Sequence, residues 1–305
     1  MNKYNLYPLT KDNAVEPFGM YNSGVICYFN STFQCLFSCS SFVDYVMNGM
    51  YDNNMLESIK LLLIKHKNDK NNTSLDLGLF NIFMSKIKKK DIEHSNFGFN
   101  QEDVCELITI LLEVIDDNYI YSLFLHKYKC NLFCLDCRKS KEVKEDTGFI
   151  FDVNVKDINN NFIKSNIQTN ESNLTKYIRN NYSHCSGVKC ENCNSLKIIK
   201  TNRLMNVPTI ILISFDKYES KYLYNYPSSV DFINSVKEKN KHMFSVVSTI
   251  HHNGTKNFGH YYAKCKRGDN WYNCNDMGIS DNVDISPEQN VYVVAYHYLN
   301  TIEYF

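Results

Sequence analysis

The chain has 305 residues, of which 33 are Lys or Arg and 33 are Asp or Glu, so its formal net charge is zero. Hydrophobic residues make up 44% of the chain and charged residues 22%, which is the composition of a folded globular protein and excludes a disordered one. A balanced charge removes the usual electrostatic basis for binding nucleic acid or a membrane surface, and we expect neither partner.

The cysteine content and the absence of targeting signals bear on the cellular compartment. The longest apolar runs, over 61–64 and 209–215, are far shorter than the roughly 20 residues that span a bilayer. The first residues, MNKYNLYPLTKDN, lack the apolar stretch of a secretory signal. We therefore expect a soluble protein of the cytosol or nucleus, or of the host cytosol if the chain is viral. Its 12 cysteines would then be reduced and serve in metal binding, catalysis or burial.

Apolar residues at helical spacing predict four helices in the first 125 residues. They are expected over about 27–40, 54–67, 77–90 and 102–117. The last has the clearest apolar face, and acidic residues stand at its start, where the helix dipole favours negative charge.

The second half of the chain has short β-like runs separated by turn residues. Strands are predicted over 147–155, 208–215, 244–251, 259–266, 270–274 and 291–298. An Asn-rich stretch over 156–182 is predicted to be a long connection with a short helix near 174–179. A helical half followed by a β-rich half predicts an α+β fold with a cleft between the two.

The first chemical signal is Cys27, a cysteine at the predicted start of a helix. The positive end of the helix dipole would lower the pKa of its thiol and increase the thiolate fraction. The glycine-bearing turn before it would let main-chain N–H groups and the Asn22 amide point at a developing oxyanion. Taken alone, the same residue also fits a thiol that merely packs in the core.

The second signal is a histidine followed by an amide and a carboxylate. A thiol nucleophile needs an imidazole base, and the base needs a group that orients its far nitrogen. His260 begins one predicted strand, while Asn275 and Asp276 end the next strand after a tight turn. Adjacent antiparallel strands would bring His260 close to one of these two residues, and the spacing leaves both open. The alternative for His260 is a structural polar residue at a strand end.

The third signal is a pair of Cys-x-x-Cys sequences, formed by Cys134, Cys137, Cys190 and Cys193. Four thiolates suit a closed tetrahedral zinc site, which is structural because no ligand position is left for substrate. Two unrelated buried pairs or redox-active thiols are the alternatives. Cys130 and Cys185 lie nearby in sequence, but their spacing fits a zinc site less well. We expect one structural Zn²⁺ and no catalytic cofactor.

Together these residues resemble the ubiquitin-specific proteases, a family of papain-like cysteine deubiquitinases. The family's cysteine box, G-L-x-N-x-G-N-T-C-Y-x-N-S, is similar to GMYNSGVICYFNS over Gly19–Ser31. Its Q-Q-D-A-x-E-F box is similar to the sequence over Gln101–Leu107. The histidine box, H-x-G-x4-G-H-Y, matches His252–Tyr261, and the closing W-x3-[ND]-D matches Trp271–Asp276. The resemblance covers about residues 17–299.

The resemblance implies one catalytic domain over residues 1–305 with a papain-like α+β fold. A helical thumb would occupy about 17–125, zinc-binding β fingers mainly 126–215, and a β-rich palm mainly 216–305. The implied activity is hydrolysis of the isopeptide or peptide bond after the C-terminal glycine of ubiquitin. The implied catalytic residues are Asn22, Cys27, His260, Asn275 and Asp276, with Asn275 favoured as the direct partner of His260.

The resemblance also implies where ubiquitin would bind. Asp103 and Glu106 lie three residues apart on one predicted helical face and would hold its arginine-rich tail, although an ordinary solvated face is the alternative. The glycines around His260 would leave a channel that admits only Gly-Gly. The full substrate-binding set is Gln101, Asp103, Glu106, Gly259 and Tyr261.

Two other functions remain open from the sequence. One is a pseudo-protease that binds ubiquitin without cleaving it, and the other is a protease for a different ubiquitin-like modifier. Val25 and Ile26 replace the family's Asn-Thr before the cysteine, and Glu102 replaces a glutamine. None of these changes removes a chemical participant, which argues against the pseudo-protease. We expect a monomer that binds ubiquitin or ubiquitin-conjugated proteins.

Overall fold

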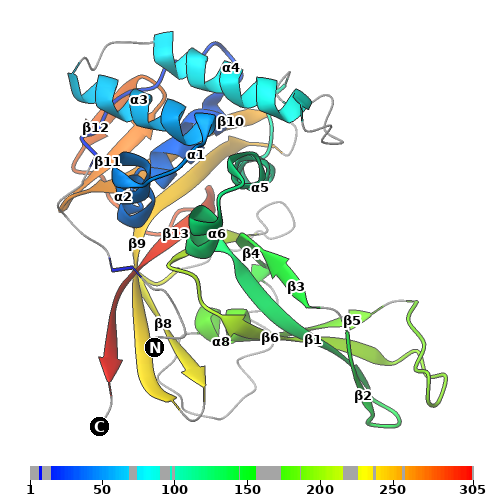
Figure 1. The fold of residues 1–305 in the computed structure, drawn as a ribbon. Coiled ribbons are helices and arrows are strands. Elements are labelled where there is room, and N and C mark those ends of the chain that lie inside the picture. Colours follow the sequence, from blue (N-terminus) through cyan, green and yellow to red (C-terminus); the bar gives the residue numbers. More distant parts are fainter. Residues whose placement is uncertain are drawn as a thin grey trace.

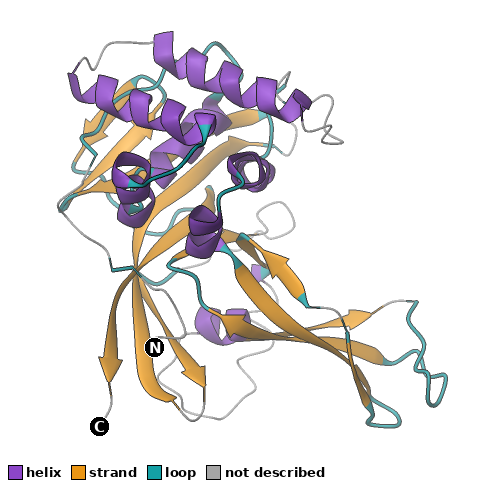
Figure 2. Cartoon of the chain, viewed as in Figure 1, coloured by secondary structure: helices purple, strands orange, loops and turns teal. Residues whose placement is uncertain are grey.

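The computed structural model describes residues 7–8, 15–68, 74–89, 97, 100–143, 145–155, 173–185, 187–215, 226–235, 238–255 and 258–303. In these residues a group of helices covers one end of a large sheet, and a smaller sheet projects away from the body (Figure 1). Most of the helices lie together at that end, while the projecting part is almost entirely strand and loop (Figure 2). None of the described helices is long and apolar enough to cross a bilayer.

The helical region contains α1 (Cys27–Leu36), α2 (Ser40–Asn48), α3 (Asn54–Asn68), α4 (Ser74–Lys89), α5 (Val104–Ile115) and α6 (Asn118–Phe124). The helices predicted over 54–67, 77–90 and 102–117 are confirmed as α3, α4 and α5. The predicted helix over 27–40 is wrong in its extent, because α1 ends at Leu36 and a second helix follows. The main-chain N–H of Ser41 donates to His297 Nε2 at 3.3 Å, and this contact satisfies the start of α2.

Two short helices, α2 and α6, were not predicted, because nine and seven residues are too few to establish a helical period. The start of α6 is fixed by a cap instead. Asp117 accepts hydrogen bonds from the main-chain N–H groups of Tyr119 at 2.9 Å and Ile120 at 3.0 Å. Local capping thus defines a helix that the apolar pattern does not show.

The large sheet has eight strands in the order β12-β11-β10-β9-β13-β7-β4, with β8 paired to β9. Its strands are β4 (Ile150–Val153), β7 (Ile210–Phe215), β8 (Ser229–Ser235), β9 (Glu238–Gly254), β10 (Gly259–Arg267), β11 (Asn270–Asn275), β12 (Gly278–Asp281) and β13 (Val291–Glu303). β4 and β7 are parallel, whereas the other pairs are antiparallel. Five of the six predicted strands are confirmed here as β7, β9, β10, β11 and β13.

The small sheet has the order β2-β1-β6-β5, with β3 also paired to β1. Its strands are β1 (His126–Cys134), β2 (Ser140–Glu142), β3 (Asp146–Gly148), β5 (Asn180–Cys185) and β6 (Ile198–Asn206). The predicted strand over 147–155 is wrong as one unit, because β3 belongs to this sheet and β4 to the large one. The polar sequences of β1 and β6 explain why neither was predicted.

Helix α8 (Asn173–Arg179) corresponds to the short helix predicted near 174–179. The preceding part of the predicted polar connection, residues 156–172, lies outside the described residues. The division into thumb, fingers and palm segments stays a prediction. Within the segment 126–215, β4 and β7 lie in the large sheet and not in the small one.

The main core lies between the helices and the large sheet. Every residue of α1 is buried, and the helix packs against β10 as well as α5. A second core holds α8 against strands of the large sheet, β8 among them. At the tip of the small sheet the buried cluster consists of Cys134, Cys190 and Ile198 among the described residues. The sheet tip therefore has almost no apolar core of its own.

Candidate active site

Cys27 is the first residue of α1 and is only 3% exposed. The loop before it is shaped by Asn22, whose side-chain oxygen accepts from the main-chain N–H groups of Gly24 at 2.8 Å and Ile26 at 3.1 Å. These bonds direct the chain into the start of α1. The Cys27 N–H lies in the first turn of the helix, where a main-chain N–H has no acceptor within the helix.

The thiol of Cys27 does not have the lowered pKa predicted from the helix dipole. Burial raises its pKa above the ordinary value of 9.0, and the negative charge of Asp276 raises it further. The main-chain N–H of Tyr261 and the side chain of Gln101 act in the opposite direction. Desolvation outweighs the hydrogen bonds that lower the pKa of this thiol. The resting thiol therefore needs a base to remove its proton.

His260 lies at the start of β10, and its side chain is 41% exposed. Its Nε2 atom is 2.6 Å from Asn275 Oδ1 and 3.9 Å from Asp276 Oδ2. A carboxamide oxygen can only accept, so Nε2 carries the proton and Nδ1 is left as the basic nitrogen. The next residue, Tyr261, contacts the Cys27 sulfur through its main-chain N–H. The pairing of β10 with β11 thus brings the imidazole and the amide together, and α1 packs its first residue, Cys27, against the start of β10.

Asp276 connects the cysteine loop to the sheet more than it contacts the imidazole. Its Oδ2 accepts from Asn22 Nδ2 at 2.9 Å, and its Oδ1 accepts from Asn30 Nδ2 at 2.8 Å. Its main-chain carbonyl accepts from the Met20 N–H at 2.9 Å. Sequence reasoning missed Asn30, which is 2% exposed. Its position in the cysteine box, three residues after Cys27, was the available signal.

Gln101, predicted to bind substrate, lies against both the nucleophile and the start of β10. Its Oε1 accepts from the Gly259 N–H at 2.8 Å, and its Nε2 donates to the Gly259 carbonyl. The same Nε2 is 3.5 Å from Cys27 Sγ. Gly259 has no room for a side chain, because a Cβ there would be 2.3 Å from His252 Nε2. This close packing fixes the start of the strand that carries His260.

Asp103 and Glu106, which were predicted to share a helical face and to bind substrate, both lie at the start of α5. Asp103 precedes α5 as its N-cap and accepts from the N–H groups of Cys105 at 2.7 Å and Glu106 at 3.2 Å. Its other carboxylate oxygen accepts from the Tyr292 hydroxyl. Both carboxylate oxygens of Asp103 therefore accept hydrogen bonds from the protein itself.

Glu106 instead lines an open groove of about 670 Å³ between α5 and the strands β3 and β4. Glu113 and Asp152 also line this groove, and sequence reasoning missed both. They lie on the helix and on the facing strand, which no local sequence pattern connects. The groove is therefore acidic on two walls.

Tyr261 was predicted as a substrate-binding residue, but its side chain is buried at 4% exposure. Its ring packs 4.3 Å from the His252 ring and 6.0 Å from the Tyr292 ring, measured between centroids. The contact that it offers at the active site is its main-chain N–H.

The four predicted metal ligands meet at the tip of the small sheet. The sulfurs of Cys134, Cys137, Cys190 and Cys193 all lie within 4.8 Å of one another. Cys134 Sγ is 3.6 Å from Cys193 Sγ, and Cys137 Sγ is 3.6 Å from Cys190 Sγ. Tetrahedral zinc with Zn–S bonds of about 2.3 Å separates its sulfurs by about 3.8 Å, so the cluster fits this ion.

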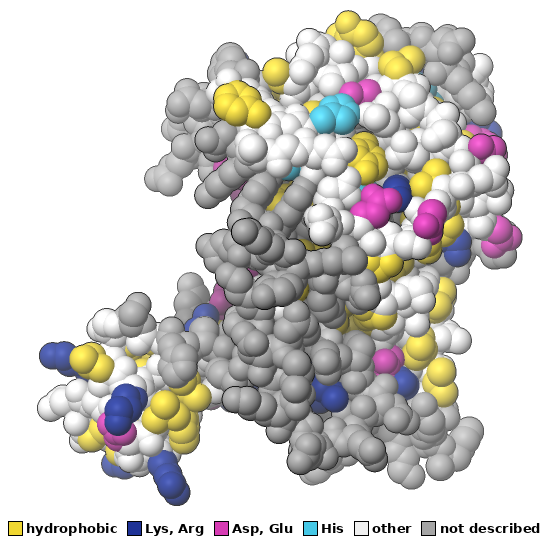
Figure 3. Space-filling model, turned by 180° about the vertical axis from the view of Figure 1, so that it is seen from behind, with side chains coloured by type: hydrophobic (Ala, Val, Ile, Leu, Met, Phe, Trp, Pro, Cys, Tyr) yellow, Lys and Arg dark blue, Asp and Glu magenta, His cyan; other side chains and the backbone are white. Residues whose placement is uncertain are grey.

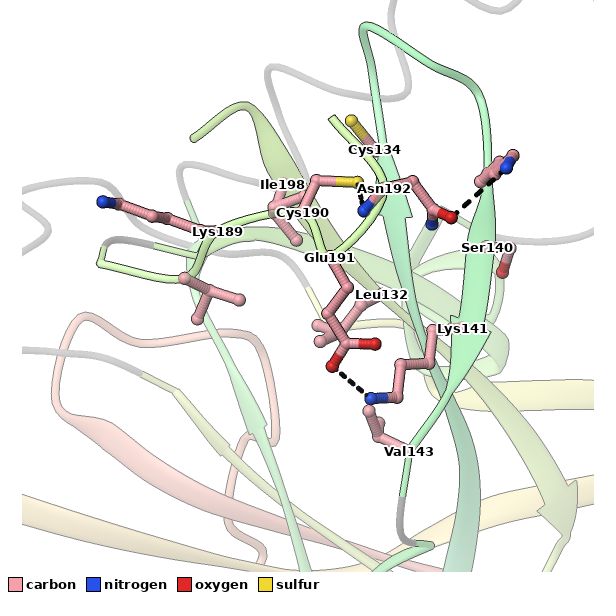
Figure 4. Close-up of a pocket in the computed structure, with 12 residues that line it drawn as sticks. Leu132, Cys134, Ser140, Lys141, Val143, Lys189, Cys190, Glu191, Asn192 and Ile198 are labelled. Atoms are coloured by element: carbon pink, nitrogen blue, oxygen red, sulfur yellow. Dashed lines mark hydrogen bonds and ion pairs between the residues drawn. The ribbon is translucent and has the colours of Figure 1, made fainter. Parts of the chain in front are cut away.

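The surface around this cluster is basic and partly apolar. Figure 4 shows Cys134 and Cys190 above Leu132, with the Glu191 carboxylate directed at the Lys141 ammonium. Seen from behind, the tip carries Lys and Arg side chains around yellow apolar patches (Figure 3). Leu196 is 59% exposed there. The tip is thus stabilised by thiols and polar contacts more than by a core.

Comparison with known protein families gives one match over most of the chain. The model of the family "Ubiquitin carboxyl-terminal hydrolase" matches residues 18–296. Ubiquitin carboxyl-terminal hydrolase 8 of Saccharomyces cerevisiae is 23% identical over 345 aligned positions, covering 93% of this chain and 70% of that protein. Ubiquitin carboxyl-terminal hydrolase 11 of Schizosaccharomyces pombe is 30% identical over 106 positions, covering 32% of this chain and 30% of that protein.

Solved structures with a similar fold include Ubp8 in two complexes. In the SAGA DUB module of Ubp8, Sgf11, Sus1 and Sgf73 bound to monoubiquitin, the matched chain has a TM-score of 0.71 and 18% identity. That match covers 97% of this chain and 72% of the other. The module bound to ubiquitin aldehyde gives a TM-score of 0.69 at 18% identity, covering 95% and 71% of the two chains. The likeness extends to nearly all of this chain's fold.

Proposed function

This chain belongs to the ubiquitin carboxyl-terminal hydrolase family and is a cysteine-type deubiquitinase, and on that premise we propose that Cys27, His260 and Asn275 form its catalytic triad. The observation that carries the proposal is the 2.6 Å contact between His260 Nε2 and Asn275 Oδ1. This contact directs the Nε2 proton at the amide and keeps Nδ1 basic. The strand that carries His260 also contacts the nucleophile through the N–H of Tyr261.

The reaction begins with transfer of the Cys27 thiol proton to His260 Nδ1 as the sulfur attacks the carbonyl carbon of the C-terminal glycine of ubiquitin. The imidazolium then gives this proton to the leaving lysine amine, and the C–N bond breaks to leave a thioester. Water, deprotonated by the same imidazole, hydrolyses the thioester and restores the thiol. Asn275 keeps the ring oriented throughout.

The oxyanion is stabilised by the Cys27 N–H and by the side-chain amide of Asn22. The Asn22 oxygen is held by two main-chain N–H groups of the loop, which fixes the plane of the amide. One Nδ2 hydrogen goes to Asp276, and the second is available for the substrate. A donor of this kind contributes about 3 kcal/mol to stabilisation of the transition state.

The cationic tail of ubiquitin lies along the acidic groove beside α5, where Glu106, Glu113 and Asp152 supply opposite charge. Gly259 has no room for a side chain against His252 and so holds the start of β10, which carries His260, in place. Asp103 contributes mainly by capping α5 and so fixing the helix that carries Glu106. The relatives in the two solved complexes bind monoubiquitin and ubiquitin aldehyde, which supports the same substrate here.

Cys134, Cys137, Cys190 and Cys193 hold one structural Zn²⁺. All four ligands are thiols of the protein, so the ion serves to cross-link the strands of the small sheet and not to activate water. Its binding stabilises a sheet tip that has few buried apolar residues.

Hydrolysis of a fluorogenic ubiquitin C-terminal amide tests the proposal, with wild type, Cys27→Ala and Cys35→Ala assayed in parallel. Cys35 lies on the same helix, is 1% exposed, and serves as a matched control for loss of a buried thiol. We expect activity in wild type and Cys35→Ala and none in Cys27→Ala. Amides of other ubiquitin-like modifiers should be cleaved more slowly.

Two outcomes contradict the proposal in different ways. Activity only on another modifier would replace ubiquitin as the substrate. Binding of ubiquitin by folded, zinc-loaded wild type without cleavage would identify a pseudo-protease.

A further inference from the structure

A buried carboxylate–imidazole pair lies behind the cysteine loop, outside the machinery described above. Asp76 is in the first turn of α4 and His66 in the last turn of α3, and they are 1% and 3% exposed. His66 Nε2 is 2.9 Å from Asp76 Oδ1. A buried carboxylate without hydrogen-bond partners destabilises the fold. His66 supplies a partner for one oxygen of Asp76, and the other oxygen needs a partner as well.

The second oxygen of Asp76 contacts the cysteine loop. Asp76 Oδ2 accepts a hydrogen bond from the main-chain N–H of Tyr21 at 2.8 Å. Tyr21 directly precedes Asn22, the proposed oxyanion donor. A side chain from the outer helices thus holds the main chain one residue before a group that must be aimed accurately.

The imidazole of His66 also contacts the loop. The Phe18 ring stacks on it with centroids 3.9 Å apart and planes inclined by 11°. The Phe18 carbonyl in turn accepts from Gln34 Nε2 at 2.7 Å. On the other side of the loop, the Met20 N–H donates to the Asp276 carbonyl. The segment from Phe18 to Tyr21 is therefore fixed between the α3–α4 pair, α1 and the end of β11.

We propose that Asp76, supported by His66, is a positioning residue that aims the Asn22 amide at the oxyanion. The inference rests on the proposed function, because it assigns Asn22 the oxyanion role. Asp76 acts through the Tyr21 N–H and touches neither substrate nor nucleophile in this role. A displacement of a catalytic group by about 1 Å can reduce the rate by about 100-fold. Loss of the contact that holds this loop should therefore lower kcat.

His66 completes the arrangement by occupying one oxygen of the buried Asp76 side chain. Its Nδ1 has no hydrogen-bond partner among the described residues. A carboxylate oxygen accepts, so His66 Nε2 is the donor in its contact with Asp76 Oδ1. His66 therefore keeps one carboxylate oxygen occupied and leaves the other directed at Tyr21.

Four variants separate positioning from simple stabilisation. Asp76→Ala removes the Tyr21 acceptor, whereas Asp76→Asn can keep it, provided that the His66 proton moves to Nδ1. His66→Phe keeps a ring against Phe18 but removes the donor. Asp117→Ala is the matched control, because Asp117 also accepts main-chain N–H groups but caps α6.

The measurements are kcat and KM for the fluorogenic ubiquitin amide, together with hydrogen exchange at the Tyr21 amide. For Asp76→Ala we expect kcat to fall about 10- to 100-fold with KM changed less than about twofold, and Tyr21 to lose protection. His66→Phe should show a smaller loss of kcat, and Asp76→Asn should retain most of it. Asp117→Ala should lower thermal stability but change neither kcat nor protection of Tyr21.

A double-mutant cycle tests whether the effect of Asp76→Ala on kcat depends on Asn22. In an Asn22→Ala background, adding Asp76→Ala should reduce kcat by less than about threefold, because the group being aimed is already gone. Equal effects of Asp76→Ala and Asp117→Ala, or full additivity with Asn22→Ala, would overturn the inference. Wild type inactive on ubiquitin would instead overturn the proposed function, and unchanged Tyr21 exchange in Asp76→Ala would still overturn the positioning role.

Discussion

The active site and the tip of the small sheet both bring together residues that are far apart in sequence, but they do so by different means. At the active site, α1 is buried at every position between helices and sheet. At the tip, the buried cluster consists of two cysteines and Ile198 among the described residues. Core packing positions the first site, while four thiols position the second. The two sites should therefore respond independently to mutation and to metal removal.

The largest expected effect is loss of the tip on metal removal. Structural zinc contributes on the order of 10 kcal/mol to folding of its site, and little else stabilises this tip. In Cys190→Ser, or after chelation, we expect zinc content to fall and residues 188–197 to lose protection from hydrogen exchange. Alkylation of Cys27 by iodoacetamide should keep its wild-type rate, because the core that holds it is intact.

Cys185→Ser is the control for that comparison, because Cys185 lies near the cluster but is not one of its four ligands. It should keep one zinc per chain. A parallel change in Cys27 alkylation on loss of zinc would show that the two regions are coupled.

The next effect concerns Asn275, the proposed orienting partner of His260. Asn275→Ala removes the acceptor of the Nε2 proton, and we expect kcat to fall at least about 100-fold, since misorientation or the wrong tautomer of a catalytic histidine is costly. Zinc content should not change. Asn273→Ala, two residues earlier on β11, should be nearly silent. Wild-type kcat in Asn275→Ala would contradict the assignment of Asn275 as the direct partner of His260.

A smaller effect follows from the raised pKa of the Cys27 thiol. Burial is the main cause and the charge of Asp276 adds to it, so alkylation of the resting enzyme should still be rising above pH 9. Asp276→Asn removes the negative charge and lowers this pKa. At pH 8 the variant should therefore be alkylated severalfold faster than wild type, even though its turnover is impaired. Slower alkylation would show that lost scaffolding dominates over charge.

The smallest effect is expected from a surface ion pair beside the four clustered cysteines. Lys141 Nζ and Glu191 Oε1 are 2.5 Å apart, but the side chains are 60% and 71% exposed. Lys141→Ala should change the free energy of unfolding of the zinc-loaded protein by less than about 0.5 kcal/mol, measured by denaturant titration. The expected contribution of this ion pair to the free energy of unfolding is thus more than tenfold smaller than that of the proposed zinc site that contains Cys190. A double-mutant cycle with Glu191→Ala would reveal any larger coupling.

The residues with chemical roles could be anticipated because their order and spacing are constrained by the chemistry itself. The pairing of β10 with β11 places His260 beside Asn275, one of the two neighbours that the strand lengths had left open. The Cys-x-x-Cys pairs likewise predicted a cluster that the fold brings together. In both cases a local pattern identifies the residues, and regular secondary structure supplies the geometry.

The supporting contacts could not be anticipated, because they depend on packing between distant elements. No pattern links Asp76 to Tyr21, since their contact depends on where α4 lies against the cysteine loop. The direction of the Cys27 pKa shift depends on burial, which the helix-start position alone does not give. Asp103 illustrates a third case, in which a residue expected to bind substrate is largely used to cap its own helix.

The hydrogen bond between Asn22 and Asp276 joins residues 254 positions apart, and this has a consequence for synthesis of the chain. At translation rates of about 5–20 residues per second, the ribosome needs roughly 12–50 s to make the intervening segment. During that time the nascent chain carries its nucleophile without the base, the orienting amide or the completed oxyanion loop. A product terminated before residue 276 would therefore retain the thiol but have no hydrolase activity.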